Sequence, residues 1–140
     1  LAPDFLSSLG SQASSGYFGQ TFVEAPAMFK RNHLYYAVFG TCCCYCKKGG
    51  PVTYYTSTSP LGPYKTGKVI SANIPAQQTH IFSFLTPHGT RYMWQGDRWQ
   101  SAPDQIKGHD FTYWQPLSFD DNGDIQVLDF ENEFTVDVDV

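Results

Sequence analysis

Short runs of apolar residues, either alternating with polar ones or continuous, recur between turn-forming residues from position 21 onward. These runs are rich in β-branched and aromatic side chains, which is typical of strands. No window of a dozen residues shows helical spacing with a cap at each end, so helices should be short or absent. The pattern therefore predicts an all-β chain with strands at 22–30, 34–39, 52–57, 80–85, 91–95, 114–119, 125–130 and 134–138.

The predicted strands form two similar meanders. The segment from Glu24 to Gly40 contains a strand, an Asn-containing turn and an aromatic strand, and the segment from Gln77 to Trp99 repeats this order. A repeated meander is typical of propeller blades, although a β-sandwich has the same strand spacing. We expect a Ser- and Gly-rich, loop-rich lead-in at 1–20, one blade at 21–75, and the next blade with a C-terminal strand at 76–140.

Composition limits the classes of partner. Aromatic residues and charged residues each make up 16% of the 140 residues, which is typical of a folded domain and not of a disordered chain. The formal net charge is −4, and the largest basic cluster is Lys47-Lys48, so a nucleic-acid partner is not expected. No apolar run approaches the roughly 20 residues of a membrane helix, so no membrane partner is expected either.

The chain begins at Leu1 and shows neither an initiator Met nor a signal-peptide pattern, so we expect a processed product or a piece of a larger protein. All four cysteines lie in one run, which is too local to close long loops. Zinc is disfavoured because its tetrahedral sites need spaced ligands. A vicinal disulfide, disulfides to cysteines elsewhere in a secreted protein, and reduced buried thiols all stay open. The run is Cys42-Cys43-Cys44-Tyr45-Cys46.

The segment Val23-Glu24-Ala25-Pro26, followed by an aromatic strand, resembles the proton-donor blade of family 43 glycoside hydrolases. Further motifs of that family follow in the same order at 55–64, 77–81 and 92–99. The elements Gly96-Asp97-Arg98-Trp99 and 113–117 are most similar to the exo-β-1,3-galactanase branch. Together the motifs cover residues 22 to about 130.

The resemblance implies a five-bladed β-propeller, of which this chain would be a C-terminal fragment. It would supply about two blades of four-stranded antiparallel sheet and a partial leading segment. A propeller closes on itself to remove sheet edges, so the remaining blades of the parent chain are expected as partners.

The resemblance also implies catalytic residues. Glu24 would be the general acid of an inverting mechanism, in which a second group activates water on the opposite face of the sugar. Its apolar flanks favour the neutral form of the carboxyl. The general base would come from a blade outside this chain. In the galactanase-like branch a Gln stands in for the base, and Gln77 aligns best with it, with Gln78 one residue away. An amide could only position water.

Several residues, among them Gln78, are candidates for binding the carbohydrate substrate. Aromatic rings pack on sugar faces, which makes Trp94 and Trp99 candidates. Strand alternation places Arg98 on the face of Trp94, where it would be a hydrogen-bond donor toward the channel, or else Asp97 and Arg98 form a structural ion pair between blades. Thr41 and Cys42 lie where the resembled branch places a loop near the substrate. His109 and Asp110 could form a local hydrogen-bonded pair. No cofactor or metal is expected; calcium occurs in some relatives of the family, but no ligand cluster is visible here.

Two functions compete at this stage. The first is a glycosidase that hydrolyses O-glycosidic bonds of a polysaccharide or oligosaccharide such as β-1,3-galactan. The alternative is a non-catalytic carbohydrate-binding propeller that lacks a general base. A second carboxylate near Glu24 would discriminate between them, and Asp4 and Asp104 are the loose candidates. We expect a secreted or extracellular protein.

Overall fold

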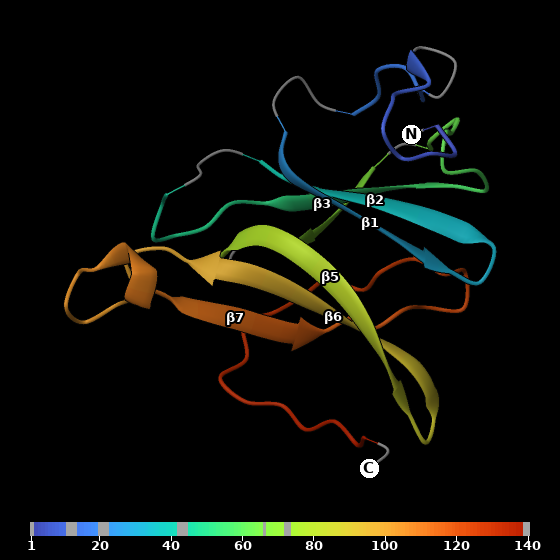
Figure 1. Cartoon of the computed structure of the whole chain (residues 1–140). Coiled ribbons are helices and arrows are strands. Elements are labelled where there is room, and N and C mark those ends of the chain that lie inside the picture. The colour runs from blue at the N-terminus through green and yellow to red at the C-terminus, as the bar shows by residue number, and fades with distance from the viewer. Residues whose placement is uncertain are drawn as a thin grey trace.

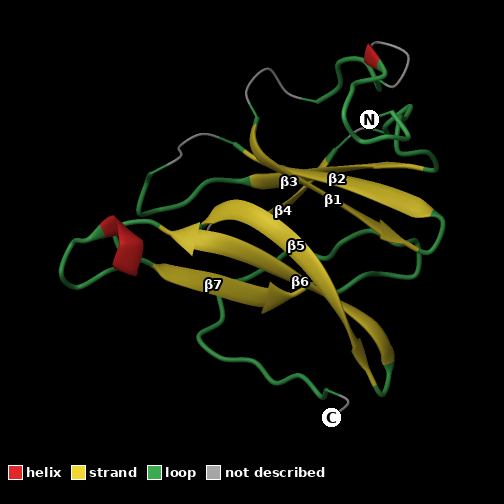
Figure 2. Ribbon diagram, in the orientation of Figure 1, coloured by secondary structure: helices red, strands yellow, loops and turns green. Residues whose placement is uncertain are grey.

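The computed structural model describes residues 2–10, 14–19, 23–41, 45–65, 67–71 and 74–138. Nearly all of its regular structure is β-strand, as Figures 1 and 2 show. The elements are β1 (Glu24–Arg31), β2 (Leu34–Gly40), β3 (Val52–Ser57), β4 (Lys68–Ser71), β5 (Gln77–Thr86), β6 (Gly89–Arg98), the 3₁₀ helix η2 (Lys107–His109) and β7 (Phe111–Pro116). The prediction of an all-β chain is confirmed.

The strands form two antiparallel sheets, one with the order β1-β2-β3-β4 and the other with the order β5-β6-β7. Each strand pairs with its neighbour in sequence, as in a meander, and the two sheets lie one above the other in Figure 2. Asn32, in the predicted turn between β1 and β2, has a φ of 54°, which Asn tolerates better than most residues. The sheets meet where β1 of the first packs beside β5 of the second.

Two expectations for the C-terminal part are wrong. The second sheet has three strands instead of four, and within the described residues 125–130 and 134–138 are not strands. Ile125 and Leu128 are both buried, and their spacing of three residues does not fit the two-residue period of a strand. The Leu128 N–H donates to the Ile70 carbonyl at 2.6 Å, so this segment crosses to the first sheet instead of extending the second.

The core lies between the two sheets and is rich in aromatic side chains. Tyr36, Tyr54 and Trp94 are almost fully buried, and Phe29 stacks on Tyr36 with ring centroids 4.6 Å apart. The Tyr36 hydroxyl donates to the Gly123 carbonyl at 2.6 Å, which gives its buried polar end a partner. These contacts bind the segment after β7 to the first sheet.

A second polar contact of the same segment involves Asp124. The Tyr54 hydroxyl donates to Asp124 Oδ1 at 2.9 Å, and Lys68 forms an ion pair with Asp124 Oδ2. Burial, together with the Asp124 carboxylate, raises the pKa of Tyr54. The Lys68 ammonium and then the Tyr54 hydroxyl hold the pKa of Asp124 below its usual range. Charge and hydrogen bonding therefore both join β3 and β4 to the C-terminal segment.

The outer face of the second sheet carries a cluster of partly exposed aromatic side chains. Ile81 and Tyr113 point into the core, and the alternation of a strand places Phe82, Phe84 and Trp114 on the opposite face. Phe82 meets Trp114 edge to face at 5.5 Å, and 49% of the Trp114 surface is exposed. Such a face suits cover by a further sheet. No helix in the described part of the chain is long and apolar enough to cross a membrane.

Candidate functional site

Glu24 is positioned by an irregular start of β1. It pairs with Gly40 on β2, and the register then shifts between Glu24 and Ala27, which is a β-bulge. Ala25 has a φ of 49°, an uncommon conformation for a residue with a side chain. Bulges bend a strand and redirect its side chains, and they occur often beside active sites. Glu24 is half-buried, while the flanking Val23 and Pro26 are exposed.

Gln77 approaches Glu24 from the other sheet. It opens β5, where it pairs with Asp97, and a second bulge follows between Gln78 and His80. Because β1 and β5 pack beside each other, the first residues of the two strands come together. Gln77 Nε2 donates to Glu24 Oε2 at 3.2 Å. The sequence-predicted pair is thus brought into direct contact from opposite sheets.

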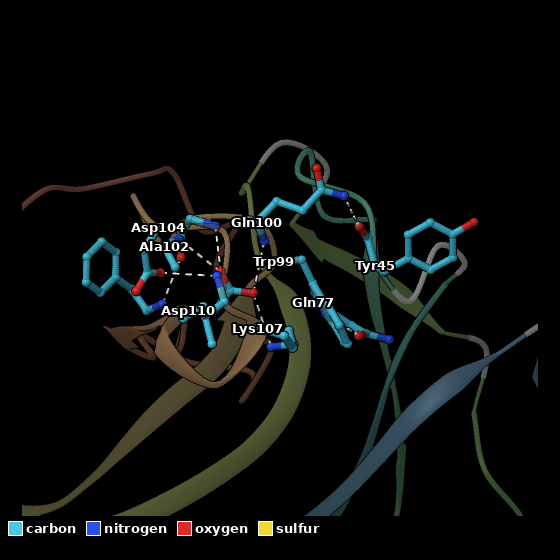
Figure 3. Close-up of polar contacts among 11 residues, drawn as sticks. Tyr45, Gln77, Trp99, Gln100, Ala102, Asp104, Lys107 and Asp110 are labelled. Atoms are coloured by element: carbon cyan, nitrogen blue, oxygen red, sulfur yellow. Dashed lines mark hydrogen bonds and ion pairs between the residues drawn. The ribbon is translucent and has the colours of Figure 1, made fainter.

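Trp99 fixes the orientation of the Gln77 amide. Its indole N–H donates to Gln77 Oε1 at 2.8 Å, as Figure 3 shows. An indole nitrogen can only donate, so the amide atom that faces it must be the oxygen. The amide nitrogen is therefore the atom that faces Glu24, whose carboxylate can accept. The three residues form one consistent hydrogen-bond chain, from Trp99 through Gln77 to Glu24.

The loop that follows Trp99 is organised by the carboxylate of Asp110. This side chain accepts hydrogen bonds from three consecutive backbone N–H groups at 2.8–3.0 Å and lies 3.3 Å from Lys107 Nζ. The hydrogen bond from the Ala102 N–H comes first among the contacts that hold the pKa of Asp110 below its usual range. Lys107 in turn lies over the Trp99 ring, 3.9 Å from its centroid, a cation–π contact. The three donors are Gln100, Ser101 and Ala102.

A second loop borders the same region. Gln100 Nε2 donates to the Tyr45 carbonyl at 3.0 Å, which links the loop after β6 to the loop after β2 (Figure 3). Gly49 holds this second loop against the start of β5, because its φ is 67° and a Cβ there would lie 2.3 Å from the Ile74 carbonyl oxygen. Between the loops lies a cavity of about 530 Å³, lined by Lys47, Trp99, Gln100, Gln105, Lys107 and Asp110.

The other predicted substrate-binding residues have varied surroundings. Arg98 lines a smaller cavity of about 240 Å³ together with Trp99, and its guanidinium lies 5.7 Å from the Phe130 ring centroid. The Thr41 hydroxyl donates to the Pro51 carbonyl at 3.3 Å and so closes the base of its loop. Trp94 is fully buried and packs edge to face on Tyr113, which leaves no ring face for a sugar. Its observed contacts are those of a core residue.

Gln78 is the predicted residue with the most unusual environment. Only 1% of its surface is exposed, and neither atom of its side-chain amide has a hydrogen-bond partner among the described residues. Its Cβ lies close to the backbone of Gly40, where an added Cβ would be 3.4 Å away. Gln78 therefore lies between the sheets. Its side chain is on the face of β5 opposite to that of Gln77, because successive residues of a strand point to opposite faces.

The cysteine run is only partly described. Cys46 is disulfide-bonded, so the alternative of a reduced thiol is wrong for this residue. Cys42, the predicted substrate-loop residue, lies outside the described residues together with Cys43 and Cys44. No group of three or more His, Cys, Asp or Glu side chains in the described ranges could hold a metal ion.

Several features of this site were not predicted from the sequence. Lys47, Lys107 and the capping role of Asp110 were missed, and the predicted His109–Asp110 pair is wrong. His109 Nδ1 instead lies 2.6 Å from Asp104 Oδ2. The only signal in the sequence for the role of Asp110 was an Asp placed just after a loop, where its carboxylate can accept hydrogen bonds from backbone N–H groups. This pattern is weak, because many Asp residues follow loops.

Neither candidate second carboxylate bonds to Glu24. Asp4 accepts a hydrogen bond from the Leu6 N–H at 3.0 Å, and Asp104 is held by His109. Within the part of the chain that the structure describes, the side chain bonded to the Glu24 carboxylate is the amide of Gln77.

The sequence matches no protein-family model and no curated protein, but the fold is similar to solved structures. An exo-β-1,3-galactanase from Clostridium thermocellum gives a TM-score of 0.65 at 24% identity, over 74% of this chain and 23% of that chain. An exo-β-1,3-galactanase from Phanerochaete chrysosporium, solved with β-1,3-galactotriose, gives 0.59 at 20% identity, over 77% and 24%. A family 43 β-1,3-galactosidase, solved with galactodeoxynojirimycin, gives 0.60 at 24% identity, over 79% and 32%.

These similarities confirm the predicted resemblance at the level of the fold. The chain has the fold of part of a β-propeller of the family 43 type, and the matched structures are galactanases and galactosidases. It spans between 23% and 32% of the length of the three solved chains.

Proposed function

We propose that the full-length protein that carries this chain is a glycoside hydrolase of the family 43 type, that it hydrolyses galactan-type polysaccharides with inversion, and that Glu24 is its general acid. The observation that carries this proposal is the Glu24–Gln77–Trp99 hydrogen-bond chain at the bulged starts of two neighbouring strands. The similarity to galactan- and galactoside-cleaving enzymes supports the substrate class.

The geometry suits the work of a general acid. Gln77 donates to Glu24 Oε2, which leaves Oε1 free to carry a proton and deliver it to the glycosidic oxygen. Because Trp99 holds the amide, the carboxyl is held in turn and needs little reorganisation when substrate arrives. Gln77 and Trp99 would therefore be positioning residues for the acid.

The same geometry argues against Gln77 as the substitute for the base. In an inverting enzyme the acid and base carboxyl groups lie about 6.5–9.5 Å apart, with the sugar and water between them. Gln77 and Glu24 are in direct contact at 3.2 Å, which leaves no room for a sugar. Water activation would then belong to a residue of the remaining blades.

The second candidate function is that of a non-catalytic carbohydrate-binding propeller. It is favoured by the partner of Glu24, which is an amide instead of a second carboxylate within the described residues. The two candidates differ in turnover and not in binding, so an activity assay separates them.

The test uses the full-length protein with Glu24→Gln and, as a matched control, Glu133→Gln, an exposed glutamate of the C-terminal segment. On β-1,3-galactan we expect Glu24→Gln to lower kcat by about 10²- to 10⁴-fold, the usual contribution of acid–base catalysis, with the thermal midpoint unchanged. Glu133→Gln should match the unmodified protein.

Aryl galactosides sharpen the test. A dinitrophenyl leaving group needs no proton, so Glu24→Gln should lose far less activity on it than on galactan. Equal losses on both substrates would contradict the acid role. Proton NMR of the first product should show the inverted anomer, and retained anomeric configuration would contradict the mechanism. Oligosaccharide binding without hydrolysis by the unmodified protein would favour the second candidate.

An extracellular location is part of the proposal. Polysaccharide substrates lie outside the cell, and the disulfide at Cys46 supports an oxidising compartment. The remaining blades of the full-length protein would cover the face that contains Phe82, Phe84 and Trp114, since propeller blades stack face to face.

A further inference from the structure

The two cavities described above are adjacent, because Lys47, Trp99 and Gln100 line both of them. The two together, between the loops that follow β2 and β6, are here named the interblade groove. Strand register places this groove at the same end of the sheets as the candidate acid, since Glu24 pairs with the last residue of β2 and Gln77 pairs near the end of β6.

The groove is positively charged although the chain is acidic. The chain has 9 Lys and Arg against 13 Asp and Glu, yet the groove contains Lys47, Arg98 and Lys107 and one carboxylate, Asp110. Asp110 is already engaged by three backbone N–H groups and by Lys107. Its charge is therefore directed into the loop and not into the groove.

Two of the three cations form no ion pair with a carboxylate in the described part of the chain. Lys47 is exposed, and within the described residues neither it nor Arg98 forms an ion pair. Arg98 contacts the Phe130 ring at 5.7 Å instead. Lys107 lies over the indole of Trp99. The groove thus presents unneutralised positive charge next to an aromatic ring.

The remaining lining groups suit a sugar. Gln100, Gln105 and Ser101 can exchange hydrogen bonds with hydroxyl groups, and the volumes of about 530 and 240 Å³ are in the range of small-ligand sites. A neutral sugar would use the amides and the ring but would leave the cations unused. A carboxylate on the sugar would use them all.

We propose that the interblade groove binds a uronic acid residue of the polysaccharide, with its carboxylate between Lys47 and Arg98. This proposal rests on the proposed function, because it takes the polysaccharide substrate as the ligand. It adds that this polysaccharide carries carboxylate groups. Trp99 joins the two sites physically, since it lines the groove and donates to the amide that holds Glu24.

The test measures binding by calorimetry to full-length Glu24→Gln protein, in which turnover is blocked. The probes are galacto-oligosaccharides that contain one glucuronic or galacturonic acid, each as the free carboxylate and as its methyl ester, which has nearly the same shape without the charge. We expect the carboxylate to bind about five- to twentyfold more tightly than the ester at low salt. The difference should shrink at 0.5 M NaCl, where exposed charges are screened.

Lys47→Gln tests the groove with a matched control beside it. It should weaken carboxylate binding about two- to fivefold, the usual effect of one exposed ion pair, and leave ester binding unchanged. Lys48→Gln removes the adjacent exposed charge, which does not line either cavity, and should change neither. Equal affinity for carboxylate and ester, or equal losses in the two variants, would overturn the proposal.

Failure of this proposal is distinguishable from failure of the proposed function. If the groove binds no carboxylate, neutral galactan is still hydrolysed by the unmodified protein and not by Glu24→Gln. If the protein is not a hydrolase, it should still bind the carboxylate probe more tightly than the methyl ester.

Discussion

Replacing Gly96 with alanine tests the packing that places the candidate site. Gly96 lies in β6, the middle strand of the second sheet. An added Cβ would lie 2.6 Å from the Trp94 ring, 2.8 Å from the Gln77 carbonyl oxygen and 3.0 Å from Ala76 Cβ. Real Cβ atoms hardly ever come this close to other atoms, so some part of the structure must move.

The size of the effect follows from what can move. In open surroundings a Gly-to-Ala change stabilises by about 0.4–1 kcal/mol, because the unfolded chain loses freedom. Overpacking a core costs about 1–3 kcal/mol. Trp94 is fully buried, and the Gln77 carbonyl is part of a paired strand, so the upper end of that range applies. The cost of about 3 kcal/mol is partly offset by the gain of about 0.4–1 kcal/mol, so we expect Gly96→Ala to lower the free energy of unfolding by about 2 kcal/mol.

The assay is urea unfolding of the full-length protein followed by tryptophan fluorescence, with Gly108→Ala as the control. A Cβ at Gly108 meets no heavy atom within 4 Å, so this variant should be at least as stable as the unmodified protein, with a gain of up to about 1 kcal/mol. Equal stability of the two variants would refute the close packing of β6 against Trp94 and β5. Because the clash displaces the Gln77 backbone, Gly96→Ala should also reduce galactan hydrolysis.

Two further changes test polar contacts. Trp99→Phe removes the N–H that orients Gln77, and kcat on galactan should fall about fivefold, the worth of one hydrogen bond, with KM changed less than about twofold. Trp114→Phe, on the outer face, should alter neither, and identical kinetics of the two variants would contradict the positioning role. Lys68 holds the pKa of Asp124 low, so this pair contributes stability above about pH 4 that is lost as the pH falls through the depressed pKa. The pair is worth at most about 1 kcal/mol because Lys68 is exposed. In thermal melts between pH 6 and 2, the melting temperature of Asp124→Asn should fall less on acidification than that of the unmodified protein. Parallel curves of melting temperature against pH would exclude the linkage.

The strands could be predicted from the sequence where the two faces of a strand differ in polarity or where aromatic residues are concentrated. The alternation around Ile81 and the aromatic run of β2 are local signals, and β1 to β3, β5 and β6 lie close to where they were expected. The signal failed at 125–138, where Ile125 and Leu128 are buried by an irregular segment. Apolar residues there reflect contact with the first sheet and not a strand period.

The candidate acid could be proposed from its motif, but its partner could not be assigned a role. Gln77 is separated from Glu24 by 53 positions, and nothing in the sequence says that its amide nitrogen faces the carboxylate. The same holds for Trp94 and Trp99, which have the same side chain. Only their positions show that Trp94 fills the core and that Trp99 donates to Gln77.

The sequence by itself determined the β-strand character, the two meanders, the likeness to family 43 propellers and the identity of Glu24 as a candidate acid, because these depend on local periodicity and short motifs. The tertiary structure alone decided that the Gln77 amide donates to the Glu24 carboxylate, and that Lys47, Arg98 and Lys107 line neighbouring cavities. The physical reason is that the packing of β1 beside β5, and of two loops far apart in sequence, sets these distances. Side-chain distances between segments far apart in sequence are fixed only when the sheets pack.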